Sequence, residues 1–203
     1  PRRGMNPAQW SVFVEAEGKV HVIELISGVR KIKGLGVLDA FETFSPIKHG
    51  EEVLVGQKVL TRVPLRLPEM SKGMLRRAQT ISAKDAGFIT SRMGIGPNDR
   101  ILEAGIGSGG LSMYLARILG NSGIHVTVEP RSEHADVALE NMRRARESWS
   151  EFPTHHHIEG AIEDVIQQAV EVGGEDHRSL HAARDAVYGV FDDAFRASSA
   201  SSV

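Results

Sequence analysis

The sequence contains no cysteine among its 203 residues. This absence excludes disulfide bonds and thiolate metal ligands. No apolar run approaches the roughly 20 residues that a membrane-spanning helix needs, and no recognisable signal peptide opens the chain. We therefore expect a cytoplasmic protein that has no membrane partner.

The sequence also lacks an excess of charge of either sign. It contains 24 Lys and Arg residues and 26 Asp and Glu residues, which gives a formal net charge of −2. This balance is not that of a uniformly basic nucleic-acid-binding domain. Two short basic segments, residues 72–79 and 141–146, are candidates for contacts with phosphate, although such clusters more often form solvated helix faces.

Two regions with different patterns divide the chain. Residues 1–68 are rich in short strand-like runs, over 10–25, 28–40 and 51–63, and prolines 64 and 68 end this pattern. We predict a small β-rich N-terminal domain over 1–68 and a second domain over 69–203.

The second region alternates between helical and strand-like patterns after a predicted helix over residues 84–93. Such alternation predicts a parallel sheet with helices on its faces, and therefore an α/β fold. The Ser/Ala-rich end has the composition of a disordered tail. The predicted strands are 100–105, 124–130, 155–161 and 186–191, and the predicted helices are 109–120, 132–149 and 162–174.

Four glycines follow Ala104 at the junction of the first of these strands with the helix after it. Without Cβ atoms the backbone can turn sharply and approach a ligand closely, and the N-terminus of the helix offers free N–H groups. Gly105, Gly107 and Gly110 fit the dinucleotide pattern G-x-G-x-x-G. Glu103, Gly105, Gly107 and Gly109 fit E-x-G-x-G-x-G, a loop that receives S-adenosylmethionine (SAM). The spacing alone leaves both ligands open.

Two acids bear on this choice. Glu129 ends the second strand, where an acid accepts hydrogen bonds from ribose hydroxyls in either type of site. Glu103, at the end of the first strand, would repel a pyrophosphate but can face the ammonium group of a methionine moiety. Glu103 therefore favours SAM over NAD without excluding NAD.

Residues 50–170 resemble the tRNA (adenine-N1)-methyltransferase family that modifies the T-loop adenosine (TrmI-like proteins). The resemblance depends on an R-x-Q motif at 77–79, a Lys–Asp pair at 84–85, a G-I-x-P motif at 94–97 and the block L-E-A-G-I-G-S-G at 102–109. It implies a Rossmann-like class I SAM-dependent methyltransferase domain behind a small β-rich domain. It also implies SAM as the cofactor, tRNA as the substrate and a homotetramer.

The resemblance assigns roles to individual residues. Gln79 and its neighbours up to Ser82 would lie over the cofactor near the target base, and Glu129 would bind the ribose. Gly160 and Ala161 would contact the adenine ring through backbone N–H groups, because Ala161 stands where the family has an aspartate. The residues expected to line the methionine and ribose of SAM are Glu103, Gly105, Gly107, Ser108 and Gly109.

The C-terminal part departs from the family. The family has an aspartate and a P-x-W motif after the fourth strand, whereas this chain has Asp192 and Asp193 without that motif. Asp192 is the candidate to receive or orient the amino group of the target adenine, and we expect an incomplete C-terminal end. We expect no metal site, since His155, His156 and His157 would alternate between the two faces of a strand.

Three alternatives remain at this point. The first is a SAM-dependent methyltransferase with another substrate, such as a small molecule or a protein. The second is a non-catalytic or incomplete SAM-binding subunit. The third, weaker alternative is an NAD-binding domain, which would use the glycines of the dinucleotide pattern.

Overall fold

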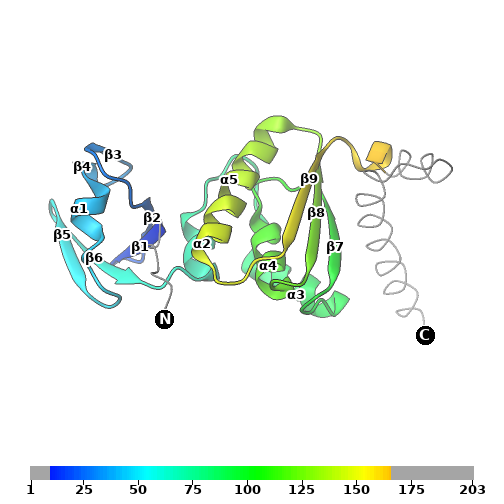
Figure 1. Cartoon of the computed structure of the whole chain (residues 1–203), viewed down its shortest axis with the longest axis horizontal. Helices are drawn as coiled ribbons and strands as arrows, with labels where there is room; N and C mark the ends of the chain where they lie inside the picture. Colours follow the sequence, from blue (N-terminus) through cyan, green and yellow to red (C-terminus); the bar gives the residue numbers. More distant parts are fainter. Residues whose placement is uncertain (1–9, 166–203) are drawn as a thin grey trace, which may run out of the picture. The chain divides into compact units, whose positions relative to one another are not determined.

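The computed structural model describes residues 10–165 of the chain (Figure 1). These residues form two compact units. The first contains residues up to Met74 together with Arg143–Ser150, and the second contains Leu75–Met142 and the residues from Glu151 onward. None of the described helices combines the length and the apolar character that crossing a bilayer would require.

The first unit is built on a four-stranded antiparallel sheet with the strand order β2-β1-β6-β5. Buried and half-buried residues alternate along β2, whereas residues 10–13 of β1 are all buried. A short hairpin of β3 and β4 and two helices complete the unit. The bounds are β1 Trp10–Glu15, β2 Val20–Glu24, β3 Arg30–Ile32, β4 Gly36–Leu38, α1 Ala40–Phe44, β5 Glu52–Val55, β6 Lys58–Val63 and α2 Leu67–Gly73.

The core of this sheet lies between its buried face and α1. Phe13 of β1 and Phe44 of α1 are both fully buried, and their ring centroids are 4.6 Å apart. Leu60 and Val55 pack into the same cluster. Aromatic pairs in this tilted arrangement add to the stabilisation that comes from burial. The β-rich pattern of the first region therefore corresponds to a sheet with a core of its own.

One local feature of the first unit differs from the sequence-based prediction. The predicted strand over 28–40 is a hairpin followed by the start of α1, because Gly34 and Gly36 adopt φ values of +81° and +92° and reverse the chain. The prolines do end the strand pattern, since β6 ends at Val63, and Pro68 lies in the first turn of α2, where proline fits.

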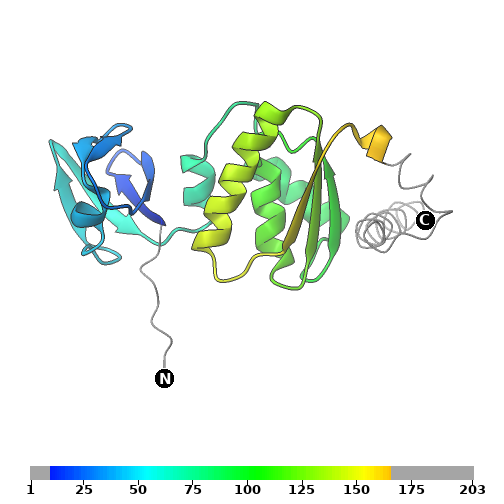
Figure 2. The same ribbon diagram turned by 45° about the horizontal axis from the view of Figure 1, so that its top comes forward.

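The second unit is built on a parallel sheet with the strand order β7-β8-β9. Figures 1 and 2 show α4 and α5 on the same face of this sheet. This architecture confirms the predicted α/β class with a parallel sheet. The bounds are α3 Ala83–Met93, β7 Arg100–Ala104, α4 Gly110–Leu119, β8 Ile124–Glu129, α5 Ser132–Ser148 and β9 Thr154–Glu159.

The register of the parallel strands brings their carboxyl ends to one edge of the sheet. Ala104 is opposite Val128, and Glu129 is opposite Glu159. Ligands of open α/β sheets bind at this edge. A helix starts again at residue 162, but most of the predicted helix over 162–174, the predicted strand over 186–191 and the C-terminal tail lie outside the described residues.

Candidate cofactor site

The glycine turn connects β7 to α4 at the carboxyl edge of the sheet. Gly105 N donates a hydrogen bond of 2.7 Å to Val128 O, which joins the start of the turn to β8. Gly105, Gly107 and Gly109 adopt φ values of +79°, +57° and +78°. Side chains rarely adopt this left-handed conformation, so all three positions favour glycine for conformational reasons alone.

The glycines of the turn differ in what lies beside them. A Cβ atom on Gly109 would lie 3.3 Å from the backbone of Ala138 in α5, and one on Gly110 would lie 3.1 Å from Thr80 Cβ. A Cβ atom on Gly105 would meet nothing within 4 Å. Gly109 and Gly110 thus make room for the protein itself, whereas Gly105 faces open space that a ligand can occupy.

Glu129, at the end of β8, points toward this turn. Its carboxylate is fully buried, and Oε2 accepts a hydrogen bond of 3.3 Å from Gly107 N. Oε1 accepts bonds from Arg131 N at 3.2 Å and from Arg131 Nε at 2.7 Å. The Glu129 carboxylate therefore lies beside the glycine turn.

The charge of Glu129 is stabilised by these donors. Burial acts to raise the pKa of its carboxyl group, but the hydrogen bonds from the Arg131 side chain and from the Gly107 and Arg131 backbone outweigh burial and leave the pKa below its usual value. The Glu129 carboxylate is therefore ionised at neutral pH and suited to accept hydroxyl donors.

Glu103 lies at the same end of the sheet and is engaged by neighbouring side chains. Ser112 Oγ donates a hydrogen bond of 2.6 Å to Glu103 Oε2, and His125 Nε2 lies 3.0 Å from the same oxygen. Glu103 is 8% exposed, and His125 is fully buried. The sequence did not indicate these contacts, because they join three separate elements.

Ser108 connects the glycine turn to the segment that precedes α3, residues 75–81, which we call the strap. Ser108 Oγ accepts hydrogen bonds from Arg77 N at 3.1 Å and from Ala78 N at 2.9 Å, and it donates to Ala78 O at 3.1 Å. Gly107 also faces the strap, since a Cβ atom there would lie 3.9 Å from Gln79 O. Gln79 is thus held beside the glycine turn, and its side chain is exposed.

Asn141 of α5 is a site residue that sequence reasoning missed. It is fully buried, and its side-chain amide group forms hydrogen bonds with both the strap and the glycine turn. A signal was available, because a polar residue beside Met142 and one turn after Ala138 lies on the apolar side of the helix. Spacing alone did not reveal its partners.

Gly160 and Ala161 follow β9 at the same edge of the sheet. Gly160 N donates a hydrogen bond of 3.2 Å to Glu129 O, so this corner lies directly beside the ribose-binding candidate. Ala161 O accepts a bond from Val165 N at the start of the next helix. Asp192 and Asp193 lie outside the described residues.

The predicted row of histidines in β9 forms hydrogen bonds with β8. Thr127 Oγ1 lies 3.0 Å from both His155 Nε2 and His157 Nδ1. Within residues 10–165, no group of three His, Asp or Glu side chains is arranged to hold a metal ion. His155 and His157 thus connect β9 to β8 through Thr127.

Comparison with known families matches residues 65–181 to the tRNA methyltransferase complex GCD14 subunit family. Among individual proteins, the chain is 36% identical over 124 residues to the tRNA (adenine(58)-N(1))-methyltransferase TrmI of Thermus thermophilus. This match covers 61% of this chain and 45% of that protein. The chain is also 42% identical over 76 residues to the tRNA (adenine(57)-N(1)/adenine(58)-N(1))-methyltransferase TrmI of Methanocaldococcus jannaschii. That match covers 37% of this chain and 27% of the relative. The chain thus spans less than half the length of these relatives.

Solved structures show the same fold. A SAM-dependent O-methyltransferase from Thermotoga maritima superposes with a TM-score of 0.58 at 25% identity, covering 75% of this chain and 56% of that one. The tRNA (m1A58) methyltransferase TrmI of Aquifex aeolicus superposes with a TM-score of 0.58 at 20% identity, covering 80% of this chain and 61% of that one. The shared fold is that of SAM-dependent methyltransferases.

Proposed function

Because the chain belongs to the tRNA methyltransferase complex GCD14 subunit family, we propose that it takes part in SAM-dependent methylation of N1 of an adenosine in the tRNA T-loop. The observation that carries the proposal is the buried Glu129 carboxylate, which accepts a hydrogen bond from Gly107 N. An ionised acid at the edge of a glycine turn that offers free space beside Gly105 suits the ribose of a nucleoside cofactor.

The ribose hydroxyls would bind Glu129 in place of two internal donors. A carboxylate offers about four acceptor positions, and those of Glu129 are occupied by two backbone N–H groups and by Nε and Nη2 of Arg131. The Arg131 side chain is 57% exposed, whereas the backbone donors are fixed. The two hydroxyl groups of a ribose would therefore replace the two side-chain donors of Arg131.

The remaining cofactor residues line the same edge of the sheet. The N-terminus of α4, whose N-cap Gly109 has no side chain that could cap it, presents N–H groups suited to the methionine carboxylate. Glu103 and Ser108 complete this side of the site, and Gly160 and Ala161 would bind the adenine ring. When bound, SAM supplies an electrophilic methyl group on a sulfonium centre.

The chain must then orient the target base, because adenine N1 already has a usable lone pair and strong base catalysis is unnecessary. Effective transfer needs the acceptor nitrogen about 3 Å from the methyl carbon and in line with the sulfur. Gln79, held beside the glycine turn by its neighbours, is the candidate to contact the base. Asp192 is the candidate to orient the adenine amino group and to offset the positive charge that grows on the ring.

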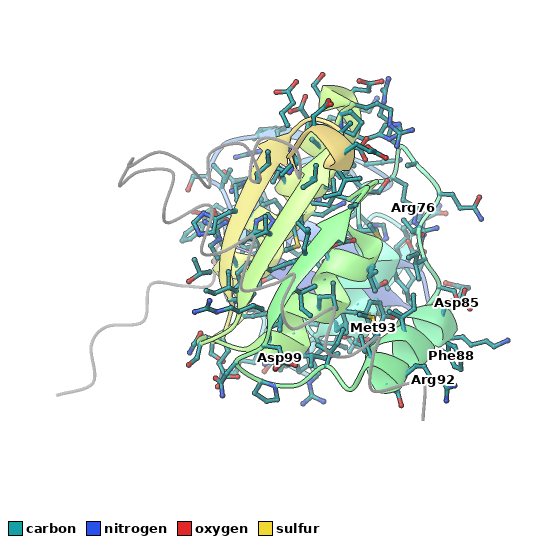
Figure 3. All side chains as sticks on the ribbon, turned by 90° about the vertical axis from the view of Figure 1, so that its right-hand side faces the viewer. Arg76, Asp85, Phe88, Arg92, Met93 and Asp99 are labelled. Atoms are coloured by element: carbon teal, nitrogen blue, oxygen red, sulfur yellow. The ribbon has the colours of Figure 1, made fainter. Side chains whose placement is uncertain are left out.

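The tRNA backbone would be bound by basic side chains near the site. Arg76 and Arg77 of the strap are exposed, and Figure 3 shows Arg76 above Asp85, Phe88 and Arg92 of α3 along one border of the view. The second basic segment, 143–146, is a candidate as well, although the guanidinium carbons of Arg143 and Arg144 already lie 5.5 and 4.8 Å from the Trp10 ring centroid.

Several wider properties belong to this proposal. They are a cytoplasmic location, assembly as a homo-oligomer with four copies, and a division of the chain into domains 1–68 and 69–203. A SAM-dependent methyltransferase of another substrate is the second candidate, because the Thermotoga maritima O-methyltransferase shares this fold at the same TM-score as the tRNA enzyme.

The proposal is tested by methyl transfer from labelled SAM to an unmodified tRNA transcript. We expect label in the wild-type transcript and none in a transcript with guanosine in place of the target adenosine. Label in both transcripts would favour another target nucleotide. SAM binding without transfer to any tRNA would support the candidate with another substrate or the non-catalytic alternative.

A further inference from the structure

Asn141 connects three elements that are distant in the sequence. Its side chain is fully buried. Oδ1 accepts a hydrogen bond from Leu75 N, and Nδ2 donates to Leu75 O and to Ser108 O, each at 2.9 Å. The amide thus uses both of its donors and an acceptor position, and it joins α5, the strap and the glycine turn.

Ser108 continues this connection from the other side. Its hydroxyl group makes three hydrogen bonds with the backbone of Arg77 and Ala78. Together with the two bonds from Asn141 to Leu75, five hydrogen bonds hold the strap, and all five involve its backbone. We call Asn141 and Ser108 the clasp.

The strap depends on the clasp because its first residues form neither helix nor strand. Backbone groups outside regular structure have no helix or strand ladder to supply their hydrogen-bond partners. Leu75, Arg77 and Ala78 find those partners in the clasp, and Gln79 follows directly. The position of Gln79 relative to the glycine turn is therefore set largely by two side chains.

We propose that Asn141 is a positioning residue for methyl transfer, which acts through the strap by holding Gln79 beside the cofactor turn. This inference rests on the proposed function of the same site. The Asn141 amide uses both of its donors and an acceptor position within the protein, so it is not expected to bind the cofactor. Its loss should affect catalysis more than SAM binding.

The clasp distinguishes asparagine from aspartate. An aspartate at 141 could still accept the bond from Leu75 N, but it has no donor for Leu75 O and Ser108 O and would place its charge against both carbonyl groups. Asn141→Asp therefore breaks two of the three bonds with almost no change of volume. Ser108→Ala removes the three hydroxyl bonds without changing α5, and it serves as the second variant if Asn141→Asp folds poorly.

The first test is trypsin cleavage of the full chain after Arg76 and Arg77, followed by mass spectrometry in the absence of cofactor. We expect cleavage at these two sites to be about tenfold faster in Asn141→Asp or Ser108→Ala, because each lost hydrogen bond shifts the local opening equilibrium severalfold. The matched control is Ser148→Ala, which removes a hydrogen bond to Arg144 O on the same helix and should leave the rate unchanged. An unchanged rate in both clasp variants would overturn the proposal.

The second test is a double-mutant cycle with Gln79→Ala, in which the kcat of methyl transfer and the Kd of SAM are measured. We expect Asn141→Asp to lower kcat by up to about 100-fold, the scale of small misplacements of a catalytic group, and to change the Kd of SAM less than threefold. In the Gln79→Ala background the same change should lower kcat no further. Multiplicative effects would contradict action through Gln79. A wild-type chain without methyl transfer would refute the proposed function, whereas the cleavage test would still decide whether the clasp holds the strap.

Discussion

Gly105 and Gly109 have nearly the same backbone conformation but different surroundings, so substitution by alanine should separate stability from binding. Their φ values are +79° and +78°. A Cβ atom on Gly105 would meet nothing within 4 Å, whereas one on Gly109 would lie 3.3 Å from Ala138 Cα and from Ala138 O. We therefore predict that Gly109→Ala impairs folding more and that Gly105→Ala impairs cofactor binding more.

The expected magnitudes follow from two terms. A non-glycine residue in the left-handed conformation costs about 1–2 kcal/mol, and both variants incur this cost. Overpacking against a rigid neighbour adds about 1–3 kcal/mol, and only Gly109→Ala incurs it, because the backbone of α5 cannot rotate away as a side chain can. The free energy of unfolding should thus fall by about 1–2 kcal/mol in Gly105→Ala and by about 2–5 kcal/mol in Gly109→Ala.

The assay combines urea unfolding, followed by circular dichroism, with calorimetric titration of SAM. Gly105→Ala should weaken SAM binding at least tenfold, since its methyl group enters the space assigned to the ligand. Folded Gly109→Ala should bind SAM with a Kd within about threefold of the wild-type value. A threefold change corresponds to about 0.6 kcal/mol, which allows for indirect strain at the site. Equal destabilisation by the two variants, or stronger loss of binding in Gly109→Ala, would refute the assignment of these glycines.

Two further predictions concern stability. Hydrogen bonds from Lys58 and His21 lower the pKa of Glu15 to about 2, so the ionised side chain should stabilise the fold above pH 4.5 and lose this effect as the pH falls toward 2. The difference in unfolding free energy between wild type and Glu15→Gln should therefore be constant above about pH 5.5 and shrink below pH 4.5; a constant difference down to pH 2 would contradict the ion pair. Gly73→Ala should lower the free energy of unfolding by about 1–3 kcal/mol because its Cβ would collide with a valine of β2, whereas Gly87→Ala, in open space on α3, should be neutral or stabilising by up to about 1 kcal/mol. The opposite order in urea unfolding would show that the packing at α2 is not as described.

The sequence was sufficient to locate the glycine turn and its acid. Gly105 and Glu129 could be predicted because a strand, a glycine-rich turn and an acid at the end of the next strand form a local and ordered pattern. The α/β alternation could be predicted for the same reason, since its periodicity is repeated along the chain. These features depend on neighbours in the sequence.

The contacts that define the site more finely depend on partners far apart in the sequence. Glu103 is bonded to His125, 22 residues away, and Asn141 is bonded to Leu75, 66 residues away. No local pattern reports such pairs. The different surroundings of the glycines could not be predicted for the same reason. The spacing cannot show that Gly109 and Gly110 make room for other parts of the chain, whereas Gly105 faces open space.

Calorimetric titration of SAM into the wild-type chain and into Glu129→Ala tests the central claim most directly. The predicted result is micromolar binding by the wild type, no response to NAD, and at least tenfold weaker SAM binding by Glu129→Ala, because hydrogen bonds to a charged group contribute about 1.5–3 kcal/mol. Equal SAM affinity in the two proteins, with both folded, would contradict the assignment of the Glu129 carboxylate to the ribose.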